Sequence, residues 1–305
     1  MPYESISHNK ITWVNITQPT PADIERLQRE YPHFHPLDLE DCLSRIERPK
    51  IDEYETYLFI VMQFPVWDAV RRISRPSEVD FFLGSGYLVT VHDGELKPLN
   101  NLFEQCREDA GVRDRYMNSG ASRLFHTTID HLVDYIFPIL YKVDANIHEI
   151  EERLFSENAR ETIQNIAIVR RDIIALGRII KPQVLIVHNL EQIDRPFIRE
   201  DLDVYFGDIL DHLQKARDIV EDNAEMIASL ADTNNALTSY RINEVMRILA
   251  VISVIMLPLT LIAGLFGMNV PLPLRDHPVS FWLTLGMMLV ISFMMLVYFR
   301  YRRWL

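Results

Sequence analysis

The feature that most constrains this 305-residue chain is an uncharged stretch toward its C-terminal end. Ile248 to Phe266 comprises nineteen residues without a charged side chain, and Phe281 to Tyr298 is a second uncharged run. A helix of that length rises about 28 Å, close to the thickness of the hydrocarbon core of a bilayer. Uncharged runs this long are rare in soluble cores, so the two runs predict a hairpin of membrane-spanning helices rather than a buried hairpin.

Basic residues flank the two runs unequally. Five arginines lie before the first run or after the second, namely Arg241, Arg247, Arg300, Arg302 and Arg303. Between the runs there is only Arg275, beside Asp276. The positive-inside rule therefore predicts two cytoplasmic termini and an outward-facing loop over residues 267–280. The sequence opens without the apolar segment of a secretory signal, which favours the plasma (inner) membrane of a prokaryote.

The first run has two unlike faces. Steps of three and four residues follow side chains that are mostly small or polar: Asn243, Met246, Ala250, Ser253, Leu257, Thr260, Gly264 and Gly267. Small residues allow close approach of helix backbones, and hydroxyls and amides can contact water. Helix packing alone explains such a face equally well. The amides of Asn243 and Asn269 near its two ends favour a path for water.

Short motifs accompany this face. Gly267-Met268-Asn269 ends the first run, and four further motifs surround it: Asn243–Met246, Pro258–Thr260, Ile262–Gly264 and Arg303–Leu305. Together with the second run, they resemble the signature of the CorA family of magnesium/cobalt transporters. In the N-terminal part, His35-Pro36-Leu37 and Arg48-Pro49-Lys50 also resemble that family, so the likeness extends over essentially the whole chain.

The remainder of the sequence predicts an α/β domain followed by helices. Expected strands are Ile11–Ile16, Tyr57–Phe64, Val79–Leu83 and Tyr87–Val91, the last two forming a hairpin, and helices are expected from Pro21 and over Lys97–Ala110. From about Ser122 onward the periodicity is helical. We expect a cytosolic α/β domain at 1–115, a cytosolic helical region with a stalk at 116–246, and a two-helix transmembrane pore domain at 247–305.

Charge and composition exclude other classes. The net charge is −12, and residues 241–305 contribute +4, so the preceding part carries −16. Such an acidic part argues against nucleic-acid binding and suits a domain in contact with cations. No catalytic constellation can be assembled, and Gly84-Ser85-Gly86 lacks the Lys-Ser/Thr of a nucleotide site, so we expect no enzyme. Cys42 and Cys106 are predicted to be reduced and buried.

A heptad-like seam precedes the first run. It comprises Ile209, Leu213, Ala216, Val220, Asn223, Ile227, Leu230, Asn234 and Leu237, in a stretch without proline. If it is continuous with the span, this helix is roughly 90 Å long. We expect the same helix of neighbouring subunits to cover the seam, with the helices around 163–190 outside. Two spans cannot enclose a water path, so several copies are required; the resemblance implies a homopentameric funnel.

These features predict a channel for a hydrated cation. Mg²⁺ dehydrates reluctantly, so carbonyls of Gly267 and the amide of Asn269, with Met268 between them, are expected to contact the waters of Mg²⁺ or Co²⁺ as a selectivity filter. Thr260 and Asn243 would offer further oxygens. Leu249 and Leu257 are predicted to form an apolar constriction.

The resemblance also implies regulation by Mg²⁺ bound between subunits. Asp68 and Asp208 match by position, although each also fits a solvated surface acid. Members of the family usually carry acidic residues soon after Gly-Met-Asn, whereas residues 270–276 contain no glutamate here, which leaves the choice of ion open. One alternative is a proton-coupled Zn²⁺ transporter of the ZntB type, although both runs lack a titratable residue. Another is a membrane-anchored sensor without conduction, which has no need of amides at both ends of the span.

Overall fold

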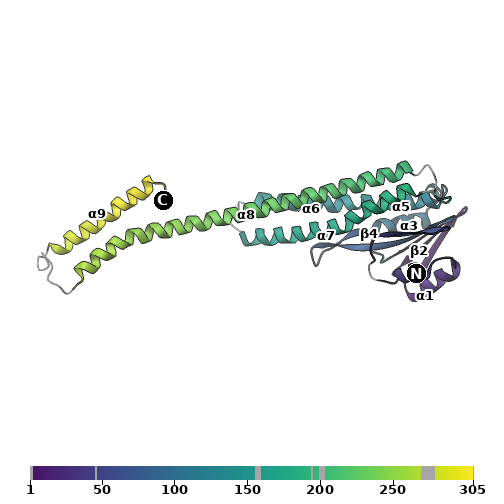
Figure 1. Ribbon diagram of the computed structural model, residues 1–305, viewed down its shortest axis with the longest axis horizontal. Coiled ribbons are helices and arrows are strands. Elements are labelled where there is room, and N and C mark those ends of the chain that lie inside the picture. Colours follow the sequence, from purple (N-terminus) through teal and green to yellow (C-terminus); the bar gives the residue numbers. More distant parts are fainter. Residues whose placement is uncertain are drawn as a thin grey trace. The chain divides into compact units, whose positions relative to one another are not determined.

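The computed structural model of the protein describes residues 3–44, 47–154, 159–193, 195–198, 203–268 and 279–304 (Figure 1). It contains two compact units, unit 1 (Met1–Ala231) and unit 2 (Asp232–Leu305). The division falls within helix α8 (Asp203–Phe266), so each unit contains a part of this helix. The predicted α/β N-terminal domain, long helix and C-terminal apolar helices are all present.

Unit 1 is built on a six-stranded sheet. Its strands are β1 (Tyr3–His8), β2 (Ile11–Thr17), β3 (Lys50–Glu53), β4 (Tyr57–Asp68), β5 (Ile73–Gly84) and β6 (Tyr87–His92). Their order is β1-β2-β6-β5-β4-β3, with β2 and β6 parallel and the other neighbours antiparallel. The predicted hairpin joins β5 to β6, where Gly84 pairs with Tyr87. Gly86 in its turn has a φ of +86°, which glycine adopts without strain.

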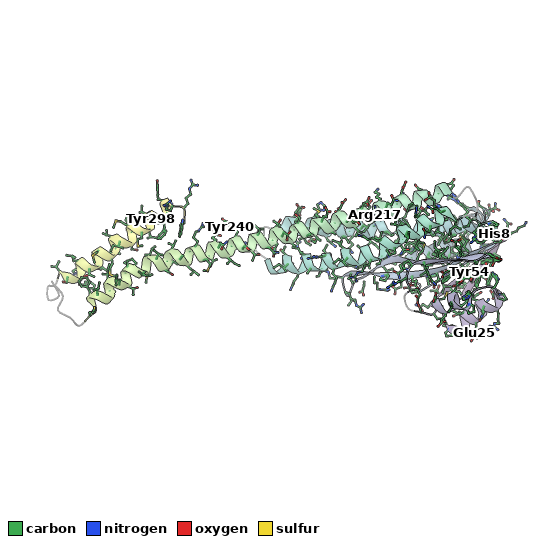
Figure 2. All side chains as sticks on the ribbon, viewed as in Figure 1. His8, Glu25, Tyr54, Arg217, Tyr240 and Tyr298 are labelled. Atoms are coloured by element: carbon green, nitrogen blue, oxygen red, sulfur yellow. The ribbon has the colours of Figure 1, made fainter. Side chains whose placement is uncertain are left out.

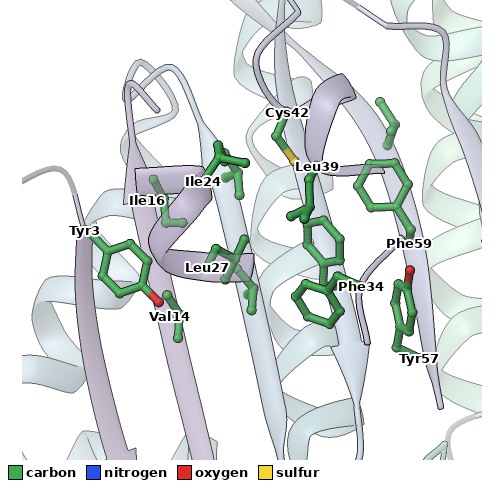
Figure 3. Close-up of a cluster of buried hydrophobic side chains, with 14 residues drawn as sticks. Tyr3, Val14, Ile16, Ile24, Leu27, Phe34, Leu39, Cys42, Tyr57 and Phe59 are labelled. Atoms are coloured by element: carbon green, nitrogen blue, oxygen red, sulfur yellow. The ribbon is translucent and has the colours of Figure 1, made fainter. Parts of the chain in front are cut away.

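Two short helices, α1 (Pro21–Glu30) and α2 (Pro36–Asp41), cover one face of the sheet (Figure 3). α1 begins as predicted, with Pro21 in its first turn and a reciprocal pair of hydrogen bonds between Thr20 and Asp23. The cluster on this face comprises Tyr3, Val14, Ile16, Ile24, Leu27, Phe34, Leu39, Cys42, Tyr57, Phe59, Val61, Phe82, Val89 and Val91. Cys42 and Cys106 are both free and buried, as expected.

The opposite face of the sheet is covered by helices α3 (Lys97–Glu108), α5 (Ala121–Asp134) and α7 (Ala159–Gln192). Trp13 of β2 meets Phe103 of α3 edge-to-face, with ring centroids 5.0 Å apart. Phe81 of β5 meets Phe125 of α5 in the same way at 5.2 Å. Because both faces of the sheet are covered, the side chains of β4 are apolar in a nearly continuous run and do not alternate between apolar and polar.

The secondary structure differs from the prediction in several places. The helix expected over 97–110 ends at Glu108, because Asp109 is extended and its carboxylate accepts hydrogen bonds from the N–H groups of Gly111 and Val112. This caps a separate helix, α4 (Ala110–Met117). Strand β4 continues past the predicted end to Asp68, and β5 begins at Ile73 instead of the predicted Val79, so Pro65 of β4 lies opposite Pro76 of β5. The edge strands β1 and β3 were not predicted, since both are short and largely polar.

The predicted seam of α8 is buried within this single chain. Its members from Ile209 to Leu230 are at most 7% exposed. A Cβ on Gly177 of α7 would lie 3.5 Å from Val220 of α8, and Phe206 of α8 meets Phe125 of α5. The expectation that neighbouring subunits cover this seam is therefore wrong. Helices α5, α6 (Ile136–Arg153) and α7 of the same chain cover it.

Among the described residues, three helical stretches are long and apolar enough to cross a membrane: Glu161–Gln192, Tyr205–Phe266 and Ser280–Tyr301. The most apolar window of the first is 50% buried inside the protein, against 6% and 0% for the other two. α7 packs against β4, β5 and α6, so its apolar side belongs to the core of unit 1. The two uncharged runs identified in the sequence lie in the other two stretches.

In unit 2, helix α9 (Ser280–Tyr301) lies beside the C-terminal part of α8 (Figure 1). Val251 of α8 and Phe299 of α9 are buried. Half-buried side chains recur every three or four residues on both helices, among them Ile255, Leu259 and Ile262 on α8, and Thr284, Met288, Ile291 and Met295 on α9. Each helix thus turns one narrow face toward the other. Most remaining side chains are exposed, including Tyr240 and Tyr298 (Figure 2).

Candidate functional site: an exposed face of helix α8

The residues predicted to line a pore form one exposed surface on α8. We call this surface the α8 stripe; it comprises Asn243, Met246, Leu249, Ala250, Ser253, Leu257, Thr260 and Gly264. All eight are exposed in the single chain, and Leu257 is 71% exposed. Four of them, Ser253, Leu257, Thr260 and Gly264, also line one shallow groove. The spacing read from the sequence therefore does place these side chains together.

The α8 stripe faces away from α9. Successive residues turn by about 100° around a helix, so residues two apart lie on nearly opposite sides. Ser253, Leu257 and Gly264 are each two residues away from a buried or half-buried position, namely Val251, Ile255 and Ile262. Pairing of the two apolar helices therefore leaves the α8 stripe uncovered.

The hydroxyl groups of the α8 stripe are oriented as hydrogen-bond acceptors. Ser253 Oγ donates to the carbonyl oxygen of Leu249 at 2.8 Å, and Thr260 Oγ1 donates to that of Met256 at 2.8 Å. Each hydroxyl has one hydrogen, so its lone pairs remain available. A water molecule bound to a cation is a hydrogen-bond donor. These two side chains can therefore contact a hydrated cation without carrying charge.

Gly267 and Met268, the two described residues of the predicted filter, follow directly after the end of α8. Gly267 N–H donates to the carbonyl oxygen of Ala263 at 2.9 Å, and Met268 N–H donates to that of Leu265 at 3.3 Å. A Cβ on Gly267 would lie 3.0 Å from the Ala263 oxygen, so this turn favours glycine. Asn269, the third residue of the filter, lies outside the described residues.

Asp68, one of the two carboxylates matched to a regulatory site, caps a turn. Its Oδ1 accepts hydrogen bonds from the N–H groups of Val70 and Arg71 at 2.9 and 3.0 Å, just after β4. The Arg71 guanidinium lies 3.9 Å from Oδ2. These N–H groups, that of Arg71 first, and the charges of Arg71 and Arg75 hold the pKa of Asp68 below its usual value. Asp68 is thus ionised, with a basic counter-ion beside it.

Asp208, the second matched carboxylate, belongs to different surroundings. It lies near the start of α8, close to His126 of α5, whose Nε2 is 3.1 Å from the carbonyl oxygen of Tyr205. Burial lowers the pKa of His126, and the carboxylates of Asp130 and Asp208 act in the opposite direction. The contacts described for Asp68 and Asp208 have no residue in common.

The structure brings together a third group of potential metal ligands, which the sequence does not reveal. Asp130 and Asp134 of α5 meet His212 of α8, with one potential ligand atom from each within 4.8 Å of the others. The only sequence signal is the spacing of four between the two aspartates, which places them on one helix face. His212 is far away in sequence and is brought to them by packing.

The protein has two long apolar helices attached to an acidic α/β domain, and one of these helices has an uncovered face of mostly small or polar residues. This arrangement fits a membrane protein. The sequence matches the family described as CorA-like Mg²⁺ transporter protein over residues 8–303, and the chain belongs to that family. Members of this family are transporters and not enzymes.

Individual relatives agree with this assignment. The chain is 31% identical to the putative metal ion transporter YfjQ of Bacillus subtilis, over 100% of this chain and 93% of that protein. It is 32% identical to the cobalt/magnesium transport protein CorA of Thermotoga maritima, over 96% of this chain and 83% of that protein. The fold matches the complete structure of the CorA magnesium transporter from Methanocaldococcus jannaschii, with a TM-score of 0.87, 20% identity, and coverage of 98% and 94%.

Proposed function

We propose that this protein is a channel for Mg²⁺ and Co²⁺ in a prokaryotic plasma (inner) membrane, built from several identical copies, five by family resemblance. The observation that carries this proposal is the uncovered α8 stripe, which faces away from α9 and contains small residues, two hydroxyls and the amide of Asn243. One hairpin cannot enclose a path for water. Copies arranged around an axis would bring their stripes together, with α9 toward lipid.

The ion would pass with its water. Mg²⁺ loses its hydration shell reluctantly, so uncharged acceptors that contact the bound waters are sufficient for selection. Gly267, Met268 and Asn269 would form the outer filter. Thr260 and Asn243 would be further stations along the α8 stripe. Leu249 and Leu257, both more than half exposed in the single chain, would form an apolar constriction that excludes water when closed.

The arginine distribution supports cytoplasmic termini, and therefore a cytosolic domain at 1–115, a cytosolic helical region at 116–246 and a pore domain at 247–305 with the loop 267–280 outside. In this orientation the acidic part of the chain contacts cytosolic cations. Mg²⁺ bound between Asp68 of one copy and Asp208 of its neighbour would hold the pore closed. Loss of this ion would leave two carboxylates that repel each other.

The deciding experiment measures ion flux into liposomes that contain the purified full chain. We expect uptake of Mg²⁺ and Co²⁺ without a proton gradient, and Asn269→Ala should abolish selectivity while the oligomer still assembles. Zinc uptake that follows the proton gradient, with no Mg²⁺ flux, would instead support the ZntB-type alternative. Absence of any flux would support a membrane-anchored sensor. Normal Mg²⁺ selectivity in Asn269→Ala would contradict the filter assignment.

Regulation is tested in the same liposomes. A variant with both Asp68→Ala and Asp208→Ala should continue to conduct when internal Mg²⁺ is high, whereas the wild type should close. Because Asp68 also caps a turn, Asp208→Ala alone serves as the variant with an intact turn. Inhibition that is unchanged in both variants would remove these residues from the sensor.

A further inference from the structure

A pocket within unit 1 lies between helices α6 and α7 and the turn that joins β4 to β5. Its volume is about 760 Å³, which is within the range of ordinary small-molecule sites. α6 and α7 follow each other in the chain and pack as an antiparallel pair (Figure 1). The pocket is bordered by residues between 142 and 153 of α6 and between 161 and 172 of α7, so it extends over about three helical turns, or about 16 Å.

One end of this pocket is basic. It is bordered by Arg72 from the turn, by Lys142 from α6 and by Trp67 from β4. Lys142 Nζ lies 5.1 Å from the centroid of the Trp67 ring. Arg72 and Lys142 are both exposed, and neither forms an ion pair with a residue that the structure describes. Two cationic side chains at one end of a pocket are suited to bind an anion, and phosphate oxygens above all.

The turn that carries Arg72 is held in place by α7. Arg72 has a φ of +53°, in the left-handed region that residues with a Cβ seldom adopt, and such positions concentrate at functional sites. Arg171 Nη2 donates to the carbonyl oxygen of Arg71 at 2.9 Å, and Ser74 N–H donates to Asp172 Oδ1 at 2.5 Å. Because these bonds tie both sides of Arg72 to α7, its backbone position at the pocket is fixed.

Three acidic residues also border the pocket, but they leave its basic end positive. Asp172, at that end, is 3% exposed, and burial raises its pKa and so favours its neutral form, although hydrogen bonds and a nearby arginine act in the opposite direction. Glu149 is paired with Arg153 at 2.7 Å. Glu161 begins the bordering part of α7, eleven residues from Asp172, so the antiparallel packing places it at the other end.

The middle of the pocket combines an apolar wall with two amides. The wall is formed by Val143, Ile150, Ile168 and Val169. Asn146 of α6 and Asn165 of α7 lie beside it, and both are half-buried. A side-chain amide offers hydrogen-bond donors and an acceptor. A flat heteroaromatic base, which has apolar faces and an edge of donors and acceptors, matches this part of the pocket.

We propose that this pocket binds a nucleoside triphosphate such as ATP. The phosphates would contact Arg72 and Lys142, and the base would lie against the apolar wall with its edge toward Asn146 and Asn165. The turn Ala69–Arg72 is the one that Asp68 caps, so the nucleotide would contact the same turn as the carboxylate proposed for regulation. The proposal concerns binding alone, and it does not depend on conduction.

The test measures labelled ATP bound to the purified full chain in detergent by equilibrium dialysis. EDTA is present, so that a metal ion at Asp68 or Asp208 cannot hold the nucleotide. We expect saturable binding of about one ATP per chain. Inorganic triphosphate and adenosine each supply only one half of the ligand, so each should bind at least about tenfold more weakly than ATP.

Three variants and one control test the two parts of the pocket. Lys142→Gln and Arg72→Gln should each weaken ATP binding at least about tenfold, through loss of a charge-assisted hydrogen bond. Asn165→Leu should weaken ATP binding but leave triphosphate binding unchanged. The matched control is Lys215→Gln, because Lys215 Nζ also lies over an aromatic ring, 5.6 Å from the Phe137 centroid, but does not border the pocket. This control should bind ATP as the wild type does.

Absence of saturable ATP binding by the wild type would overturn the proposal, as would wild-type affinity in both glutamine variants. Triphosphate that binds as tightly as ATP, or an unchanged ATP affinity in Asn165→Leu, would contradict the nucleotide assignment and leave a site for phosphate only. Thermal unfolding shows whether each variant is folded. The readout is binding without metal, so failure of the proposed channel function and failure of this site are distinguishable.

Discussion

Two stretches of the same helix contrast sharply. Between Ile209 and Leu230 the regularly spaced residues of α8 are mostly apolar, and the chain's own helices bury them. Between Asn243 and Gly264 the spacing continues, but the side chains are mostly small or polar and remain exposed. Periodicity alone indicates that a helix has a special face. The chemistry of that face indicates whether the chain covers it by itself or leaves it for copies, water and lipid.

The largest expected effect comes from the same substitution, alanine to aspartate, made in both stretches of α8. Ala216 is fully buried in the first, and Ala250 is exposed in the second. Ala216→Asp places an unpaired carboxylate in the core and should destabilise unit 1 by more than about 3 kcal/mol. Ala250→Asp should leave unit 1 folded. Thermal unfolding of both full-length variants in detergent, followed by circular dichroism, measures the difference.

Equal loss of folded protein in both variants would mean that the second stretch is also covered within one chain. In that case the α8 stripe would be unavailable to line a pore. If both variants remain folded to the same extent, the stretch from Ile209 to Leu230 is not part of the core of unit 1.

The next effect concerns acid, to which the two units should respond differently. His92 is buried on β6, where its Nδ1 accepts a hydrogen bond from Gly94 N–H and its Nε2 lies 3.0 Å from Asn15 Oδ1. Burial lowers the pKa of His92 to about 4, below its usual value near 6.5. Between these values the unfolded state binds more protons, so His92 reduces stability as the pH falls, by up to about 3 kcal/mol at pH 4.

The measurement compares the wild type with His92→Gln in thermal unfolding from pH 7 to pH 4. The buried carboxyl of Asp80 acts in the opposite direction, because burial raises its pKa, so the informative quantity is the difference between the two proteins. We expect this difference to shrink as the pH falls from 6.5. The run Ile248–Phe266 has no titratable group and should not contribute. A difference independent of pH would show that His92 is not held neutral.

The sequence predicts local features of this protein better than long-range ones. The capping of α1 by Thr20, the turn at Gly86 and the uncharged runs all follow from neighbouring residues. The seam of α8 was predicted with its correct members but the wrong partner, because a periodic face does not specify what covers it. β1 and β3 were missed because short polar strands lack alternation and are held by pairing with a neighbour.

The candidate sites also differ in whether the local sequence or long-range packing determines them. The α8 stripe was predictable residue by residue, since a single helix places all its members. The group of Asp130, Asp134 and His212 was not, because it depends on how α5 packs against α8. Asp68 was identified by position, but its role as the cap of a turn became evident only from its backbone hydrogen bonds.

A smaller effect tests which face of the hairpin contacts the ion. Thr260 of α8 and Thr284 of α9 both donate their hydroxyl hydrogens to the carbonyl oxygen four residues earlier, at 2.8 and 2.9 Å. Thr260 is exposed on the α8 stripe, whereas Thr284 is half-buried. Thr260→Val should lower Mg²⁺ flux about tenfold, equivalent to about 1.4 kcal/mol, through loss of one acceptor. Thr284→Val should leave the flux unchanged; equal losses would remove the hydroxyl from the ion path.

The smallest expected effect concerns one glycine on each of the two apolar helices. Gly264 on the α8 stripe and Gly286 on α9 both have open space where a Cβ would be, so neither glycine is required for packing within the chain. Alanine at either position should change the stability of the monomer by less than about 1 kcal/mol. If copies approach each other along the α8 stripe, Gly264→Ala should reduce flux about threefold by separating their backbones, while Gly286→Ala should not. Flux measured side by side in liposomes decides between the two faces, since an effect confined to Gly286→Ala would place α9, and not α8, at the contact between copies.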